Sequence, residues 1–71
     1  MASFIRGRCL LQSHLEEINM SQAELSRRSG YSQRMISHFV NNERKMSADA
    51  MYTISLIIGC EMSNLYEWIK K

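Results

Sequence analysis

A single glycine, Gly30, stands between two stretches with helical patterning, and only one tyrosine separates it from the second stretch. So short a connection forces consecutive helices to meet at a sharp corner, where the facing side chains have to be small or apolar. Ser26 lies four residues before the glycine, and Ile36 lies six residues after it. This spacing predicts helices over 21–29 and 32–41 that pack against each other across a tight turn.

Capping residues mark the ends of the expected helices. Ser21 begins a capping box with Glu24 three residues later, and Ser32 stands at the start of the next apolar pattern. Ser47 opens a further helix over 47–58, which the following glycine ends. Glu24 also precedes two arginines in the order that favours helical ion pairs, so Arg27 and Arg28 are expected at a solvated helix end.

Apolar periodicity predicts one more helix at each end of the chain. Phe4, Leu11, Leu15 and Ile18 lie on one helical face, which predicts a first helix over 4–18. A fifth helix is expected near 61–69, with Met62, Leu65, Tyr66, Trp68 and Ile69 as its apolar residues. With no proline and only three glycines in 71 residues, the sequence predicts an all-α fold, a compact five-helix domain spanning 1–71.

The charge is concentrated in the middle of the chain. The whole sequence carries a formal charge of only +2, but residues 21–45 hold five basic residues against two acidic ones. Such a distribution indicates a surface for an anionic partner such as nucleic acid. Within this segment the helix over 32–41 directs its apolar residues to one side, which leaves five polar side chains on the opposite face: Gln33, Arg34, Ser37, His38 and Asn41.

These side-chain types are the ones that read bases in the major groove. Gln33 is suited to paired hydrogen bonds with adenine, and Arg34 to a forked contact with guanine. Ser37 and His38 can accept or donate, so they are expected to discriminate less. Flanking residues are expected on the phosphate backbone: Ser21, Gln22, Asn41, Arg44 and Lys45, with Arg6 and Arg8 as weaker candidates from the first helix.

The stretches Met20–Leu25 and Gly30–Gln33, with Ile36, Asn41 and the later Leu-Ile-Ile-Gly-Cys before Leu65, resemble the Cro/C1-type helix-turn-helix family. That family includes the λ-type phage repressors and Cro proteins, and the resemblance spans about residues 8–69. It implies a five-helix λ repressor-like domain whose third helix enters the major groove. It also implies that Gln22 and Gln33 touch each other and the DNA, and that Asn41 contacts a phosphate.

The sequence departs from the family pattern at four positions. Ser26 stands where alanine is common, and Asn42 stands where glycine is common. Some phage repressors pair a buried arginine with a buried glutamate, and the corresponding positions look like Leu15 and Val40 here. None of these departures lies among the residues expected to read bases.

The resemblance and the polar helix face together predict a double-stranded DNA-binding transcriptional regulator that acts as a repressor on an inverted-repeat operator. A homodimer is expected, with contacts drawn from Tyr52, Leu56, Tyr66, Trp68 and Ile69. For Tyr52 and Leu56 the other interpretation is that the fifth helix covers them within one chain. The alternative function is a protein-interaction module, such as an antitoxin that masks a toxin.

The sequence lacks the residue patterns that other functional classes require. The sequence has no nucleophile elbow, phosphate-cradling glycine loop or acid–base pair, so an enzyme with a small-molecule substrate is not expected. No ligand cluster for a metal and no cofactor motif is present, and His14 is interpreted as a half-buried structural residue. Cys9 and Cys60 are expected as free thiols in the cytoplasm, with a disulfide as the minor alternative. No stretch predicts a membrane span or a signal peptide.

Overall fold

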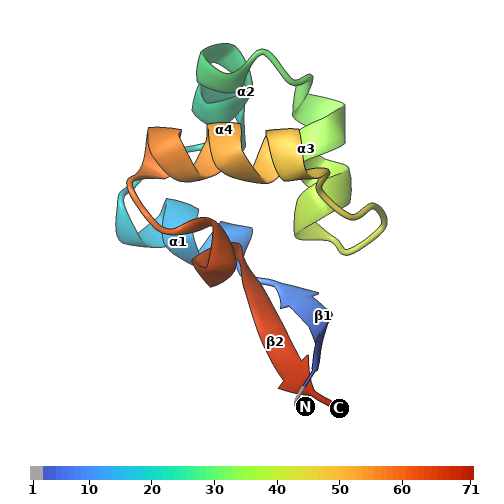
Figure 1. Ribbon diagram of the computed structural model, residues 1–71. Coiled ribbons are helices and arrows are strands. Elements are labelled where there is room, and N and C mark those ends of the chain that lie inside the picture. Colours follow the sequence, from blue (N-terminus) through green and yellow to red (C-terminus); the bar gives the residue numbers. More distant parts are fainter. Residues whose placement is uncertain (1–2) are drawn as a thin grey trace.

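The computed structural model describes residues 3–71, which form four α-helices, one 3-10 helix and two strands (Figure 1). In chain order the elements are β1 (Phe4–Cys9), α1 (Leu11–Glu17), α2 (Gln22–Ser29), α3 (Gln33–Val40), α4 (Ala48–Ile58), η1 (Met62–Leu65) and β2 (Tyr66–Lys70). The helices gather into one body, and the two strands extend from it as a ribbon. This ribbon gives the chain one long dimension, 40 Å against 22 and 19 Å.

The ribbon replaces both ends of the expected five-helix, all-α fold. The prediction of a first helix over 4–18 is wrong for residues 4–9, which form β1, and the helix begins only at Leu11. The predicted fifth helix near 61–69 is also wrong, because only Met62–Leu65 is helical, as a 3-10 turn, before β2 begins. Gly7 disfavours a helix at this position. Aromatic and β-branched residues in YEWIK favour a strand.

The two strands run antiparallel in a defined register. Phe4 pairs with Lys70, Ile5 with Ile69 and Arg6 with Trp68, and a bulge then shifts the register before Cys9 pairs with Tyr66. At Gly7 the strands lie very close, because a Cβ atom there would sit 3.0 Å from the carbonyl oxygen of Glu67. A larger residue at this position would require its neighbours on β2 to shift by a few tenths of an ångström.

Hydrogen bonds attach the ribbon to the loop between α3 and α4. The backbone N–H of Met46 donates to the Tyr66 hydroxyl at 3.0 Å, and its carbonyl accepts from the Arg6 guanidinium at 2.7 Å. The same guanidinium lies 4.8 Å from the centre of the Tyr66 ring. The backbone N–H of Cys9 donates to the Asn42 side chain at 2.8 Å. The ribbon and this loop are therefore one structural unit.

The hydrophobic core lies between the helices and receives side chains from every helix. Its largest fully buried residues are Leu11, Leu15, Leu25, Ile36, Met46, Ile54 and Leu65. In α4 the buried face consists of Ala50, Met51, Ile54 and Ser55, whereas Ala48 in the first turn is exposed. The buried hydroxyl of Ser55 donates to the Tyr52 carbonyl at 2.8 Å, so its polar atom is satisfied.

The predicted caps hold the helix ends in place. Ser21, Ser32 and Ser47 each accept a hydrogen bond from the backbone N–H three residues later, at 3.0–3.1 Å. Gly30 and Gly59 adopt left-handed conformations at the ends of α2 and α4, with φ of 82° and 78°. The glutamate half of the expected capping box differs, because Glu24 binds Arg27 and Arg28 instead.

Candidate nucleic-acid interface

The corner between α2 and α3 is present where the spacing placed it. Gly30 makes the turn, its N–H donates to the Ser26 carbonyl at 3.0 Å, and Ile36 is fully buried behind it. The hydroxyl of Ser26 donates to the Tyr31 carbonyl at 2.6 Å, a contact that an alanine at this position could not make. This bond was not predicted, although a small polar residue at the corner was the signal for it. Ser26 therefore fixes the Tyr31 carbonyl, directly before Ser32, the N-cap residue of α3.

α3 presents a polar face outward, as predicted. Ile36 and Phe39 are buried against the body, while Gln33 and Arg34 are exposed near the start of the helix. Ser37 and His38, one turn later, are partly exposed and were predicted as further base-reading residues. Asn41 at the helix end is exposed, and its side-chain amide donates to Ser37 at 3.3 Å. The structure thus brings all the predicted base-reading residues together on one helix face.

The start of α2 is arranged differently from what the family resemblance implied. Ser21 is exposed, and its hydroxyl caps the helix. Gln22, however, donates to the side chain of Gln12 in α1 at 3.0 Å rather than to Gln33. Gln12 in turn donates to Glu16 at 3.3 Å. Gln22 therefore joins α2 to α1.

Ion pairing separates the cations of the basic segment into two groups. Arg27 and Arg28 both bind Glu24, as expected for a solvated helix end. Within residues 3–71, Arg34, Arg44 and Lys45 form no ion pair, and all three are exposed. The positive charge without a carboxylate partner in residues 21–45 thus belongs to α3 and the loop after it, the region that was predicted to face DNA.

The two arginines near the amino end have structural partners instead. Arg6 binds the Met46 carbonyl and covers the Tyr66 ring, and Arg8 lies 3.6 Å from the Glu67 carboxylate across the ribbon. Neither belongs to the first helix, where they were proposed as weaker backbone contacts. Arg6 is therefore part of the support of the α3–α4 loop.

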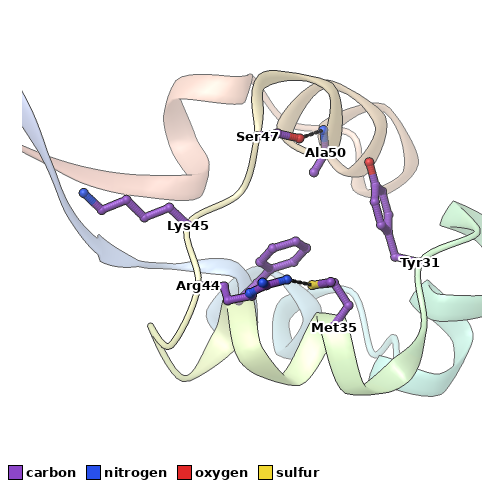
Figure 2. A pocket seen from close by; sticks show the side chains of 7 residues that line it. Tyr31, Met35, Arg44, Lys45, Ser47 and Ala50 are labelled. Carbon is purple, nitrogen blue, oxygen red and sulfur yellow. Dashed lines mark hydrogen bonds between the residues drawn. The ribbon is translucent and has the colours of Figure 1, made fainter.

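A shallow hollow of about 310 Å³ lies beside α3, between that helix and the start of α4 (Figure 2). Its lining consists of Tyr31, Met35, Phe39, Arg44, Lys45, Ser47 and Ala50. Figure 2 shows Arg44 lying along α3, while the Lys45 side chain extends away from the hollow. The Arg44 guanidinium lies 3.7 Å from the Met35 sulfur. The hollow combines a largely apolar wall with one cation, Arg44, at its rim.

The expected dimer residues fall on two separate surfaces. Tyr52 and Leu56 are exposed on α4, so the interpretation that a fifth helix covers them is wrong. Trp68 and Ile69 are exposed on the ribbon, opposite Arg6 and Ile5 in the pairing register. Tyr66 is only 3% exposed and is engaged with the Met46 backbone, so it is not available to a partner chain.

Several other expectations concern residues outside this surface. His14 binds the Asn64 carbonyl at 2.7 Å, as expected for a structural histidine. Cys9 and Cys60 are free thiols, and burial raises the pKa of both. Within residues 3–71 no three His, Cys, Asp or Glu side chains gather as a metal site would require. No helix in the same range has the length and apolar character needed to cross a bilayer.

Comparison with known proteins agrees with this geometry. No curated protein matches the sequence. Among protein families, residues 11–71 match the Cro/C1-type HTH DNA-binding domain. The match begins with α1 and extends through the corner, the outward face of α3 and the loop that carries the unpaired cations. The chain therefore belongs to the Cro/C1-type helix-turn-helix family of DNA-binding domains.

Proposed function

We propose that this protein is a sequence-specific transcriptional repressor that reads an operator half-site in the major groove with α3. The observation that carries the proposal is the combination on one surface of exposed polar residues and unpaired cations. Gln33 and Arg34 project from α3, and Arg44 and Lys45 follow it, none of them engaged by a carboxylate within residues 3–71. Repression then follows from occupancy of a site that polymerase needs.

In this proposal the base contacts come from four residues of α3. Arg34 forks onto O6 and N7 of guanine, and Gln33 pairs with N6 and N7 of adenine. Each such contact discriminates by about 1–3 kcal/mol against a wrong base. Ser37 and His38 lie one turn further along and reach the next base pairs.

Phosphate contacts flank the reading face. Ser21 and Gln22 stand at the start of α2, where free backbone N–H groups and the helix dipole favour an anion. Asn41, Arg44 and Lys45 reach the neighbouring backbone from the end of α3. Because the cations neutralise phosphates and release counterions, affinity falls steeply with salt.

An inverted-repeat operator requires a symmetric dimer, with half-sites centred about 34 Å apart. The ribbon is the better of the two candidate seams. It has four large apolar residues at least 41% exposed, namely Phe4, Ile5, Trp68 and Ile69. Two-stranded ribbons are marginally stable alone, and the outer edge of each strand has unpaired backbone groups that a second copy could use. The α4 surface, by contrast, offers only Tyr52 and Leu56.

Light scattering on two matched variants separates these seams. Ile69→Lys should convert the dimer to a monomer, because each lysine would be desolvated in the ribbon interface. Leu56→Lys should leave the dimer intact. The reverse result would place the seam on α4, and a wild-type chain that is monomeric even on a palindromic duplex would remove the dimer from the proposal.

Selection of bound duplexes from a random pool tests the function itself. An enriched inverted repeat would support a sequence-specific regulator. Arg34→Ala should then relax the preference at one base pair and leave non-specific binding nearly intact. Arg44→Ala should lower affinity for all sequences alike and reduce the salt slope by about one unit.

Two results would contradict the proposal. If Arg34→Ala weakened every duplex equally, Arg34 would be a backbone contact. A protein that retains no duplex at low salt, yet captures a stoichiometric protein partner, would instead be an interaction module of the antitoxin kind.

A further inference from the structure

One of the four proposed base-reading side chains, His38, is hydrogen-bonded to the carboxylate of Glu43. The Nδ1 atom of His38 lies 2.7 Å from a carboxylate oxygen of Glu43, which is on the loop after α3. An ionised carboxylate can only accept hydrogen bonds, so the proton of this contact belongs to Nδ1. In the neutral ring, Nε2 then has no proton and is a hydrogen-bond acceptor.

The backbone, rather than two flexible side chains, sets this arrangement. Asn42 adopts a left-handed conformation with φ of 61°, which turns the chain back toward α3. The N–H groups of Glu43 and Arg44 both donate to the His38 carbonyl, at 2.9 and 3.2 Å. The Asn42 side chain is itself held by the N–H of Cys9 from β1. Glu43 is thus placed over His38 by the same loop that the ribbon supports.

Neighbouring charges leave this contact undisturbed. Arg34 lies one helical turn before His38, and Arg44 directly follows Glu43, but neither forms an ion pair within residues 3–71. The guanidinium of Arg44 is instead 3.7 Å from the Met35 sulfur. The His38 side chain retains 35% exposure.

We propose that Glu43 is a positioning residue that makes His38 selective for bases that offer an amino group in the major groove. An Nε2 acceptor matches N4 of cytosine or N6 of adenine, whereas guanine and thymine present carbonyl oxygens to the same atom. The inference rests on the proposed function and extends it. His38 reads one class of base because a residue outside the reading face determines which nitrogen carries the proton.

The first experiment measures base preference with three variants at pH 8.5. Duplexes differ only at the base pair that faces His38, with cytosine or adenine compared with guanine or thymine. Glu43→Ala should reduce the discrimination about fivefold to tenfold, which corresponds to the loss of one oriented hydrogen bond. Glu43→Gln removes the charge and offers His38 a donor amide group as well as an acceptor oxygen, so it no longer requires the proton on Nδ1 and should keep only part of the preference. Glu61→Gln controls for the loss of one negative charge elsewhere and should change nothing.

One pattern of results overturns the inference directly. If Glu43→Ala and Glu43→Gln both alter affinity by the same factor for every base, Glu43 acts only as a charge near the phosphates. The inference is also wrong if Glu43→Ala prefers cytosine or adenine over guanine or thymine by the same factor as the wild type.

The second experiment needs no DNA, so it separates this inference from the proposed function. Nitrogen-15 spectra of the His38 ring in the free protein at pH 8.5 report which nitrogen is protonated. The wild type should show the proton on Nδ1, and Glu43→Ala should move it at least partly to Nε2. A wild-type ring protonated on Nε2 overturns the inference while DNA binding stands. If the wild type selects no duplex at all, the proposed function fails, and the specificity role of His38 fails with it whatever the spectra show.

Discussion

Replacing Tyr66 with phenylalanine removes one hydroxyl group from the contact between the ribbon and the α3–α4 loop. That hydroxyl accepts the backbone N–H of Met46 at 3.0 Å. Tyr66 is 3% exposed and Met46 is 1% exposed, so water cannot readily take the place of the lost acceptor. The variant therefore leaves a buried donor without a partner.

The expected loss of stability is large for a chain of this size. An unsatisfied buried donor costs about 1–3 kcal/mol. A typical domain with the 71 residues of this chain has a free energy of unfolding of roughly 4–10 kcal/mol. Each 1 kcal/mol lowers the Tm of a domain in this size range by about 4–8 °C. The aromatic ring and its contact with Arg6 remain, so the effect belongs to the hydroxyl group alone.

Urea unfolding followed by circular dichroism measures this loss. The matched control is Tyr52→Phe, because Tyr52 is 56% exposed on α4 and should change stability by less than about 0.5 kcal/mol. Amide exchange at Met46 should accelerate in Tyr66→Phe and not in the control. The reasoning is refuted if the two variants lose the same stability, or if Tyr66→Phe unfolds at the wild-type urea concentration.

Three further changes test other features. Gly30→Ala should lower the free energy of unfolding in urea by about 1–2 kcal/mol, because alanine is strained in the left-handed conformation of this residue. A Cβ there meets nothing within 4 Å, so no steric clash adds to the loss, and unchanged stability would mean that the corner tolerates alanine. Ser26→Ala loses the bond to the Tyr31 carbonyl and should lower the free energy of unfolding by about 0.5–1.5 kcal/mol, whereas a gain would show that the apolar corner packs better. Burial, and then the charge of Glu61, raise the pKa of Cys60, so iodoacetamide at pH 8 should modify it more slowly in the native than in the unfolded chain. For the same reason the unfolded state loses this proton first, and stability should fall as pH rises above the ordinary thiol value; equal reactivity in both states would contradict the shift.

The parts of the fold that were predictable depend on local signals. Serines at the starts of α2, α3 and α4 and glycines at two helix ends specify boundaries through hydrogen bonds between residues three or four positions apart. The outward face of α3 follows from helical periodicity, because burying Ile36 and Phe39 exposes the side opposite them. Both kinds of signal lie within one turn of the residue concerned, so one sequence is enough to interpret them.

The incorrect predictions concern contacts that local sequence signals do not specify. Phe4 lies in register with the apolar stripe of α1 only by coincidence, and its actual partner is Lys70 at the other end of the chain. Strand pairing over that separation leaves no periodic trace, although Gly7 and the aromatic residues of β2 argued against helices. Glu43 was missed in the same way, since a left-handed Asn42 brings it back to His38 across five positions.

The ribbon also bears on the order in which the molecule assembles. Pairing residue 4 with residue 70 closes a loop that contains nearly the whole described chain, at an entropic cost of roughly 2.5 kcal/mol beyond that of the shortest loops. The helices and the α2–α3 corner need only near neighbours, so they can form while the ends are still apart. We therefore expect the two ends to reach Met46 last, so that the α3–α4 loop gains its hydrogen bonds to the ribbon only when the chain has closed on itself.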